Sequence, residues 1–396
     1  MMVAGERSGD VYGAALACRL NARISDLEVF GCGGEAMRGA GVDTTVDLHQ
    51  VALIGISEVV SGLPKAYGAM RRLAREAARR KPSLAVLIDS PSFNLRLAKR
   101  LKRQGIRVIY FVSPQIWAWK KWRIKKIKAC VDKMLCLFDF EEEIYKKAGV
   151  PVEYIGHPLV DMARSRRTRE EFFVSAGLDP TLPTVALLPG SRKTEATYNL
   201  PIMLDAAARL SSSRPMQFVI AVAPTLDTRW LESLIAKCHG VKAVVRTLSH
   251  ATHDVLEHAN VAVVASGTAT IEAALCERPM VVVYRVSSFT AMCAKVMIKV
   301  PFYSMVNLLA GRAVAPELIQ DDFDATSLAA HVQALLDDRE ARNQMVQGLR
   351  EVKSRLGPGG AIERAAEAIV RHLQGPGASI NSGRSIPQHR HIDART

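Results

Sequence analysis

The fold is constrained above all by the regular alternation of short apolar, β-branched runs with longer segments of helical periodicity. The first half of the chain predicts strands over 27–32, 84–89, 107–112, 131–137 and 152–155, and helices over 9–21, 65–80, 93–104 and 139–148. The second half predicts strands over 184–188, 217–222, 241–246, 260–264 and 280–284, and helices over 198–212, 226–238, 268–276 and 326–337. This alternation is typical of parallel α/β sheets, and 396 residues are enough for two of them. We therefore predict an α/β protein of two doubly wound, Rossmann-like domains that face a central cleft.

Composition shifts along the chain suggest where these domains divide. We expect an N-terminal domain over 1–175 and a C-terminal domain over 176–357. A polar, basic junction over 156–180 separates them. The segment 358–374 has the pattern of a final helix, which we expect to pack back on the N-terminal domain. The segment 375–396 is rich in Gly, Ser, Pro and His, a composition typical of disorder.

The cysteines and the N-terminus indicate the compartment. The seven cysteines are scattered and form no C-x-x-C pair, which is typical of a protein in a reducing compartment. Glu6 and Asp10 stand where a signal peptide would need an apolar core, and no apolar run approaches the length of a membrane span. His, Cys and acidic residues show no metal-ligand spacing, and no Asp-x-Asp motif is present. We expect a cytoplasmic protein with no metal and no cofactor.

One basic region must face something anionic. Residues 65–128 hold 19 basic and two acidic residues, a net charge of +17 against +14 for the whole chain. Aromatic residues interleaved with lysine would suit nucleic acid or a membrane surface, and a solvated basic helix is the plain alternative. An apolar stretch followed by a cationic one favours the membrane, so we expect no nucleic-acid partner. The residues expected to face the membrane are Ile54, Ile56, Leu63, Met70, Arg71, Arg72, Trp117, Trp119 and Trp122.

A nucleotide site is indicated where the strand ending near 264 passes into a helix. Ser266, Gly267 and Thr268 form a tight turn at a helix N-terminus, where free backbone N–H groups bind anions. Glu272, one turn further on, would repel a phosphate but suits the diol of a ribose. A phosphate cradle beside a ribose-reading carboxylate describes a nucleotide site, and an ordinary turn with a solvated Glu is the alternative.

A second strand end supplies groups for a diphosphate. The buried strand 184–188 is followed by Gly190, Ser191 and Arg192, and an arginine there can bind a diphosphate with its planar fork. The glycines at 31–34 fit a dinucleotide fingerprint only superficially, because neither a long helix nor the required acidic residue follows. We interpret them as a wall of the cleft and exclude a nicotinamide cofactor.

Asp89 is the candidate catalytic base. It ends the apolar strand 84–88, and a carboxylate at the carboxyl end of a central parallel strand points into the cleft. The first loop carries Glu6, Ser8 and Asp10, where helix capping by Ser8 or Asp10 is the simpler interpretation. His157, at the junction of the domains, is expected near the cleft. His250 and His253 are expected on a surface helix.

Seven motifs, in order along most of residues 4–320, resemble those of the lipid-A-disaccharide synthase family. They are Ala4-Gly5-Glu6-x-Ser8-Gly9-Asp10, Asp89-x-Pro91-x-Phe93-Asn94, Val112-Ser113-Pro114-x-x-Trp117-Ala118-Trp119, Gly156-His157-Pro158-Leu159, Pro189-Gly190-Ser191-Arg192, Ser266-Gly267-Thr268-Ala269-Thr270-x-Glu272 and Asn307-Leu-Leu-Ala-Gly311. Only three residues precede Ala4 here, fewer than the first strand of similar proteins has. The segment after 375 resembles nothing in the family.

The resemblance implies a GT-B fold and a peripheral, inverting, metal-independent hexosyltransferase of lipid A biosynthesis on the cytoplasmic face of the inner membrane. Such an enzyme joins UDP-2,3-diacylglucosamine to 2,3-diacylglucosamine 1-phosphate and gives the β-1,6-linked disaccharide 1-phosphate of lipopolysaccharide lipid A plus UDP. It implies that Asp89 is the base and that Glu6, Ser8, Asp10, Asn94 and His157 line the acceptor side or the cleft. It also implies UDP-binding roles for Gly190, Ser191, Arg192, Ser266, Gly267, Thr268, Glu272 and Asn307.

Two other enzyme classes would share parts of this pattern. Another UDP-sugar GT-B enzyme, such as a cell-wall GlcNAc transferase, would have the UDP site without the Trp117–Trp119 motif. A UDP-sugar epimerase would have the fold but should carry additional acid/base groups in the cleft. Acyl-chain preference and a homodimeric state are left open by the sequence.

Overall fold

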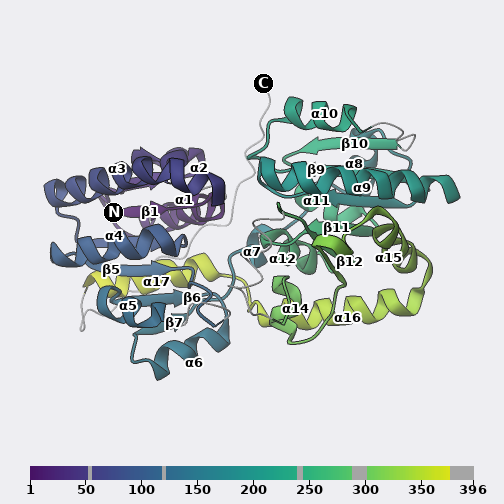
Figure 1. Cartoon of the computed structure of the whole chain (residues 1–396). Helices are drawn as coiled ribbons and strands as arrows, with labels where there is room; N and C mark the ends of the chain where they lie inside the picture. Colours follow the sequence, from purple (N-terminus) through teal and green to yellow (C-terminus); the bar gives the residue numbers. More distant parts are fainter. Residues whose placement is uncertain (52–55, 118–121, 239–243, 288–300, 375–396) are drawn as a thin grey trace.

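The computed structural model describes residues 1–51, 56–117, 122–238, 244–287 and 301–374, and it contains two parallel sheets, one in each half of the chain (Figure 1). The first sheet has seven strands in the order β3-β2-β1-β4-β5-β6-β7, and the second has six in the order β10-β9-β8-β11-β12-β13. Every adjacent pair is parallel. The predicted fold class is therefore confirmed.

The N-terminal sheet is covered by helices on both faces. Its strands are β1 (Met2–Ala4), β2 (Phe30–Gly33), β3 (Asp43–Asp47), β4 (Leu84–Ile88), β5 (Arg107–Phe111), β6 (Lys133–Cys136) and β7 (Val152–Tyr154). Its helices are α1 (Arg7–Asn21), α2 (Glu35–Gly39), α3 (Ile56–Arg80), α4 (Pro91–Arg103), α5 (Arg123–Cys130) and α6 (Asp139–Lys147). The apolar sides of α3, α4 and α5 form one core cluster with the sheet, and those of α1 and α2 belong to another. Both faces are buried, which explains the nearly continuous apolar strands.

The C-terminal sheet is built in the same way. Its strands are β8 (Thr184–Leu188), β9 (Gln217–Val222), β10 (Val244–Ser249), β11 (Val261–Ala265), β12 (Met280–Tyr284) and β13 (Glu317–Ile319). Its helices are α8 (Arg169–Ala176), α9 (Lys193–Ser213), α10 (Thr228–Ala236), α11 (Thr252–His258), α12 (Thr268–Leu275), α14 (Met305–Ala310), α15 (Ala325–Asp337) and α16 (Arg339–Arg355). Helices α9 and α15 pack together against β11 and β12, whereas α11 contacts β8, β9 and α12.

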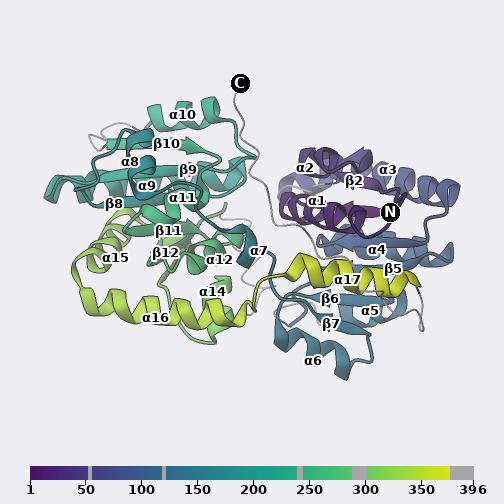
Figure 2. The ribbon, with the colours of Figure 1, turned by 180° about the vertical axis from the view of Figure 1, so that it is seen from behind.

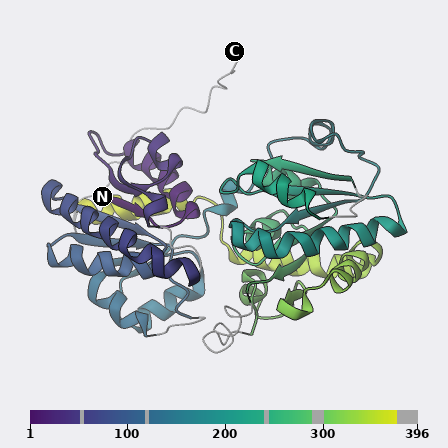
Figure 3. The ribbon, with the colours of Figure 1, turned by 45° about the horizontal axis from the view of Figure 1, so that its top comes forward.

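The chain crosses between the halves twice. It leaves the first half through α7 (Leu159–Met162), and after α16 it returns as α17 (Ala361–Gln374), which packs against α1 (Figure 2). Arg364 of α17 donates to the carbonyl of Ile155 from Nε at 3.0 Å and from Nη2 at 2.6 Å. The backbone N–H of His157 donates to the carbonyl of Leu356 at 2.9 Å. Figure 3 shows the two halves side by side, with the crossing segments between them.

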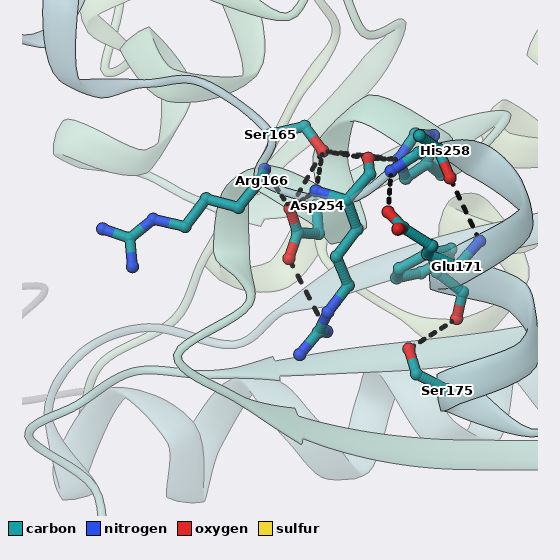
Figure 4. Close-up of polar contacts among 9 residues, drawn as sticks. Ser165, Arg166, Glu171, Ser175, Asp254 and His258 are labelled. Carbon is teal, nitrogen blue, oxygen red and sulfur yellow. Dashed lines mark hydrogen bonds and ion pairs between the residues drawn. The ribbon is translucent and has the colours of Figure 1, made fainter. Parts of the chain in front are cut away.

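The segment after α7 is anchored to the C-terminal half by Asp254 (Figure 4). Its carboxylate accepts the Ser165 hydroxyl at 2.9 Å and the backbone N–H of Arg166 at 2.7 Å. Burial opposes ionisation of Asp254, but these hydrogen bonds hold its pKa below the ordinary value. Ser165 also lies 3.3 Å from His258 Nε2. This is not a serine-hydrolase triad, in which the Asp holds the His. The Asp254 contact joins the linker to the second half of the chain, and α8 contacts α11 there.

Most predicted strands lie within two or three residues of those observed, but some elements were missed. The prediction omitted β1, β3, β13, α2, α5, α7, α8, α14 and α16. Strand β1 has three residues, pairs with both β2 and β4, and lies at the centre of its sheet. A strand this short carries no readable alternation, so only its pairing partners define it. The predicted disordered segment 375–396 lies outside the described residues.

Candidate active site

Four loops at the carboxyl ends of strands form the candidate site. In each sheet the strand order reverses once, between β1 and β4 and between β8 and β11. Ligands of doubly wound sheets bind at such reversal points. Glu6 follows β1, Asp89 follows β4, Arg192 follows β8 and Ser266 follows β11. Four of the predicted site segments therefore lie at the two places where this topology puts a ligand.

The turn that carries Asp89 is held in an uncommon conformation. Asp89 and Ser90 both have positive φ, at 51° and 45°, which non-glycine residues rarely adopt. The buried Asn94 donates from Nδ2 to the carbonyls of Ile88 at 3.0 Å and Asp89 at 2.8 Å. The Tyr110 hydroxyl donates to the same Asp89 carbonyl at 2.6 Å. The structure thus gives Asn94 the task of holding this turn.

The first loop lies against that turn. A Cβ added to Gly5 would lie 2.1 Å from the Cβ of Ser90, so only glycine permits this approach. The contact keeps Glu6, the next residue, beside the Asp89 turn. Burial raises the pKa of Asp89 to about 7, and the negative charge of Glu6 adds to the rise, against a hydrogen bond from the Ser90 backbone. A carboxyl group with a pKa near neutrality is suited to general-base catalysis at pH 7.

Arg192 faces this first loop from the other domain. Its guanidinium lies 3.9 Å from a carboxylate oxygen of Glu6 and 3.7 Å from one of Glu195. On another side, Gln115 Nε2 lies 3.1 Å from the sulfur of Met305. These contacts join the strand-end loops of the two domains, and they place Arg192 opposite the Asp89 turn.

The Gly190–Arg192 turn is closed by a carboxylate in this structure. Glu195 accepts the backbone N–H groups of Ser191 at 3.0 Å and Arg192 at 3.3 Å. Gly190 has φ 121°, and an added Cβ would lie 2.6 Å from Glu195 Cβ. A carboxylate therefore occupies the amides that a phosphate would use, and the sequence analysis did not identify Glu195.

The second cradle is open. Gly267 has φ 154°, and an added Cβ would find no atom of the described residues within 4 Å, so among these residues a ligand has room to approach its backbone. Ser266 donates its hydroxyl to the carbonyl of Tyr303 at 2.9 Å, and Thr268 begins α12. Glu272, one turn along, contacts His253 Nε2 at 2.9 Å. His253 was expected on a surface helix. It lies on α11, where its ring contacts the candidate ribose carboxylate.

Several predicted site residues turn out to be committed to the protein itself. Asp10 is buried and accepts the backbone N–H groups of Gly34, Ala36 and Met37. Asp10 therefore caps α2. Capping of α1 by Ser8 or Asp10 was expected, but Glu6 occupies the N-cap position of α1, and Ser8 lies half-buried in its first turn. The glycine segment 31–34, predicted to form a wall of the cleft, is thus bonded to Asp10 through the backbone N–H of Gly34.

Asn307 has no free group for UDP. Its Nδ2 donates to Ala315 O and Glu317 Oε1, both at 2.8 Å, and its Oδ1 accepts from Val314 N at 2.7 Å and Ala315 N at 2.9 Å. With every hydrogen-bonding position of its side chain used, this geometry does not support direct contact with UDP. Asn307 instead holds the loop that precedes β13.

Two buried rings lie beneath the site. His157 accepts the backbone N–H of Leu159 at Nδ1, and burial lowers its pKa to about 4, so it is neutral at physiological pH. Tyr12, edge-on to it at 6.4 Å, was missed by the sequence analysis. Burial and the charges of Glu272 and Asp89 hold the pKa of Tyr12 well above its usual range. The charges of Glu272 and Asp89, from different halves of the chain, both act on Tyr12. This depends on how the two halves pack, so no local motif could have identified Tyr12.

The residues expected to face a membrane separate into different groups. Met70 is 5% exposed and packs in the core with Leu73 and Ala77, so that prediction was wrong. Trp117 is half-buried, donates to the buried Glu141 at 3.1 Å and packs edge-on against Phe140, which places it within the fold. The residues Arg71, Arg72 and Trp122 are exposed. Ile54 and Trp119 lie outside the described residues, as do the side chains of Ile56 and Leu63.

The described residues contain neither a membrane-spanning helix nor a metal-binding cluster. No helix there is both long and apolar enough to cross a bilayer. Among the same residues, no three His, Cys, Asp or Glu side chains come together in a way that could hold a metal ion.

Comparisons with known proteins identify the family. A family model described as lipid-A-disaccharide synthetase matches residues 1–369. The chain is 44% identical over 374 residues to the lipid-A-disaccharide synthase of Myxococcus xanthus, covering 94% of this chain and 97% of that one. The same enzyme of Koribacter versatilis is also 44% identical over 374 residues, with the same coverage.

Solved structures support the fold. A UDP-GlcNAc 2-epimerase from Neisseria meningitidis bound to UDP-GlcNAc has a TM-score of 0.62 at 11% identity, over 93% of this chain and 98% of that one. A calicheamicin glycosyltransferase has a TM-score of 0.57 at 14% identity, over 95% and 98%. At these identities the likeness extends to the GT-B-like fold alone. The family model and the sequence relatives decide between the classes that share this fold: the chain belongs to the lipid-A-disaccharide synthase family, glycosyltransferases of lipid A biosynthesis.

Proposed function

We propose that the chain transfers a 2,3-diacylglucosamine unit from UDP to the 6-hydroxyl of 2,3-diacylglucosamine 1-phosphate. Asp89 removes the proton of that hydroxyl as its oxygen bonds to the anomeric carbon. The bond from that carbon to the UDP oxygen breaks, and UDP leaves with the electron pair. Attack from the face opposite UDP inverts the anomeric centre and gives the β-1,6-linked disaccharide 1-phosphate.

The observation that carries this proposal is the place of Asp89, directly after β4 on a loop opposite the Arg192 loop of the other domain. Burial there raises the pKa of Asp89 to about 7. An aspartate with an ordinary pKa is too weak a base to be efficient at neutral pH. Here burial and Glu6 supply the missing basicity.

The leaving diphosphate is assigned to the C-terminal domain. Arg192 can bind it with a bidentate fork. The backbone amides of Gly267 and Thr268 at the start of α12 have no acceptor among the described residues, whereas that of Ser266 already donates to the carbonyl of Val283 at 2.9 Å. Both groups stabilise charge that grows in the transition state, so we propose a metal-independent reaction. Glu272 binds the ribose hydroxyls after exchanging its contact with His253.

Glu195 must move for the first cradle to bind phosphate. Its carboxylate accepts the backbone N–H groups of Ser191 and Arg192 in this structure. A diphosphate would replace it there as the partner of these amides and of the Arg192 guanidinium. Glu195 thus satisfies the amides while no donor is bound.

Substrates of this kind carry acyl chains, which motivates a peripheral location on the cytoplasmic face of the inner membrane. The exposed Trp122, with Lys126 stacked at 4.6 Å from its ring, lies on the basic side of the N-terminal domain. An amphipathic aromatic ring beside a cation suits the headgroup region of a bilayer.

Asp89→Asn tests the assignment, because it keeps size and hydrogen bonding but removes the base. We expect turnover to fall by roughly two to four orders of magnitude, with UDP affinity and melting temperature unchanged. Product and UDP would be followed by mass spectrometry and UDP affinity by calorimetry. Turnover within a few-fold of the parent would place the base elsewhere. Conversion of UDP-GlcNAc to its 2-epimer would instead favour epimerase chemistry.

A further inference from the structure

An arginine-lined hollow lies on the outer face of the N-terminal domain, between α3 and α4. Helices α3, α4 and α5 cover the same face of the sheet (Figure 1). The hollow is open to solvent and is lined by Arg71, Ala74, Arg75, Ala78, Arg100 and Gln104. Arginine supplies most of the polar groups around it, on two neighbouring helices.

A tyrosine orients two of these arginines. The guanidinium carbon of Arg71 lies 4.8 Å from the centre of the Tyr67 ring, and that of Arg100 lies 5.2 Å from it. Stacking on an aromatic face favours a cation, and it restricts the guanidinium to one orientation. The Tyr67 side chain is 48% exposed, so the ring forms part of the surface and is not a core residue.

The positive charge in the hollow is not neutralised within the described part of the chain. None of Arg71, Arg75 and Arg100 has a carboxylate at ion-pair distance there, whereas Arg80, further along α3, contacts both Glu76 and Asp43. The field also acts on Tyr67: a hydrogen bond from Arg100 and the charge of Arg71 lower the pKa of its phenol. A site that stabilises an exposed phenolate is one that favours an anion.

The hollow is separate from the candidate active site. Helix α3 leads into β4 and α4 leads into β5, so the C-terminal halves of these helices lie at the amino ends of the strands. Asp89 lies at the carboxyl end of β4. Arg75, Arg100 and Gln104 are therefore at the opposite edge of the sheet from the reacting groups.

We propose that this hollow binds the phosphomonoester headgroup of a membrane lipid. A monoester presents three terminal oxygens and close to two negative charges, which match several guanidinium forks, whereas a diester presents two oxygens and one charge. A lipid is the occupant because the hollow shares its face of the domain with exposed Trp122 and the basic region 65–128. The inference extends the proposed membrane attachment by assigning it a headgroup preference.

The experiment compares vesicles of equal surface potential. Phosphatidylcholine vesicles carry either phosphatidic acid, a monoester, or phosphatidylglycerol, a diester, with the two contents adjusted to the same zeta potential. Binding of the full chain is measured by sedimentation. We expect roughly tenfold tighter binding to the phosphatidic acid vesicles, because general electrostatic attraction is equal for the two.

Variants distinguish specific binding in the hollow from general electrostatic attraction to the basic surface. Arg71→Gln with Arg100→Gln should abolish the preference. The control variant, Arg96→Gln with Arg103→Gln, also removes two positive charges, but from positions on α4 outside the hollow. It should weaken binding to both kinds of vesicle and keep the preference for phosphatidic acid. Tyr67→Leu leaves the charge unchanged and should also lose the preference, with catalytic turnover in detergent unchanged as proof of folding.

Each other outcome overturns the proposal. Equal binding to both vesicles, or equal loss of preference in the two double variants, would leave only non-specific attraction, and membrane attachment would still stand. Failure to bind either vesicle would contradict the attachment as well. Competition by soluble glycerol 3-phosphate at concentrations that match vesicle lipid would identify a free metabolite as the ligand.

Discussion

At the scale of single residues, the pKa of Asp89, the proposed base, depends on burial and on the charges near it. Asp89 has a pKa of about 7 because of burial and because Glu6 is nearby, while Glu6 itself faces Arg192 across the domain boundary. Tyr110 and Tyr12 lie on the other sides of Asp89 and stay protonated, since burial and Asp89 hold both pKa values above their usual range. Burial is thus the larger cause of the raised pKa of Asp89, and the negative charge of Glu6 adds to it.

A pH profile tests this coupling. The base must be deprotonated, so kcat/KM should rise with pH through a midpoint near 7. In Glu6→Gln the repulsion that raises the pKa of Asp89 is lost, so the midpoint should move to lower pH. The plateau rate should also fall, because a weaker base drives proton transfer less well. A midpoint that does not move would show that Glu6 leaves Asp89 unaffected.

The Glu272–His253 contact gives a second prediction at this scale. Glu272→Ala should weaken UDP binding by about 1–3 kcal/mol, the usual effect of losing a charged hydrogen bond. His253→Ala should have a smaller effect or strengthen binding, because Glu272 then has no partner to release. Calorimetry with UDP measures both; unchanged affinity in Glu272→Ala would contradict the ribose assignment.

At the scale of elements, α17 stabilises the N-terminal domain although it comes last in the chain. Arg364 ties it to the end of β7 through the carbonyl of Ile155 and also donates to Gly359 O at 2.8 Å. On the outer side of α17, Glu363 forms ion pairs with Arg19 of α1 and with Arg23, which follows that helix. The first set of contacts is half-buried, and the second is near the surface.

These two contacts should differ in their effect on stability. Arg364→Ala leaves carbonyl groups without a donor at the domain crossing and should cost about 1–3 kcal/mol. Glu363→Gln removes partly exposed ion pairs and should cost at most about 1 kcal/mol. The measurement is the melting temperature of each variant beside the parent. Equal losses would mean that the Ile155 contact contributes no more than a surface ion pair.

At the scale of the whole molecule, the junction between the domains responds to acid. His157 is buried between α1 and the crossing segments, and its pKa of about 4 lies below the ordinary value of 6.5. The unfolded chain therefore binds a proton that the folded chain does not between these values, so stability falls as pH drops from 6.5 towards 4. Above 6.5 the group makes no difference.

Replacing the histidine should remove this sensitivity. In His157→Asn the side-chain oxygen can still accept from the Leu159 backbone, but nothing titrates. The parent should lose on the order of 3 kcal/mol more than the variant between pH 7 and pH 4, from the size of the pKa shift. Calorimetric melting at both pH values measures the difference. A parallel decline in the two proteins would assign acid sensitivity to other groups.

Much of this architecture follows from local sequence. The apolar runs at 184–188, 217–222 and 280–284 match β8, β9 and β12, because a strand buried on both faces requires a continuous apolar stretch. Four of the seven family motifs fall in the loops after β1, β4, β8 and β11, and parallel topology brings the ends of the strands in one sheet to one edge. Fold class and family were therefore predictable from the sequence and are confirmed.

Only the tertiary structure decided what each motif residue touches. Asp10 and Asn307 share motifs with Glu6 and Gly311, yet Asp10 is bonded to backbone N–H groups, and the amide of Asn307 is used by backbone groups and by Glu317. Met70 belongs to an apolar stretch, but the helix turns it into the core. The sequence determined the elements and the order of the loops, because periodicity and turn chemistry are local. The contacts of Arg192 with Glu6 and of His253 with Glu272 join distant parts of the chain, so they depend on how the elements pack and carry no local signal.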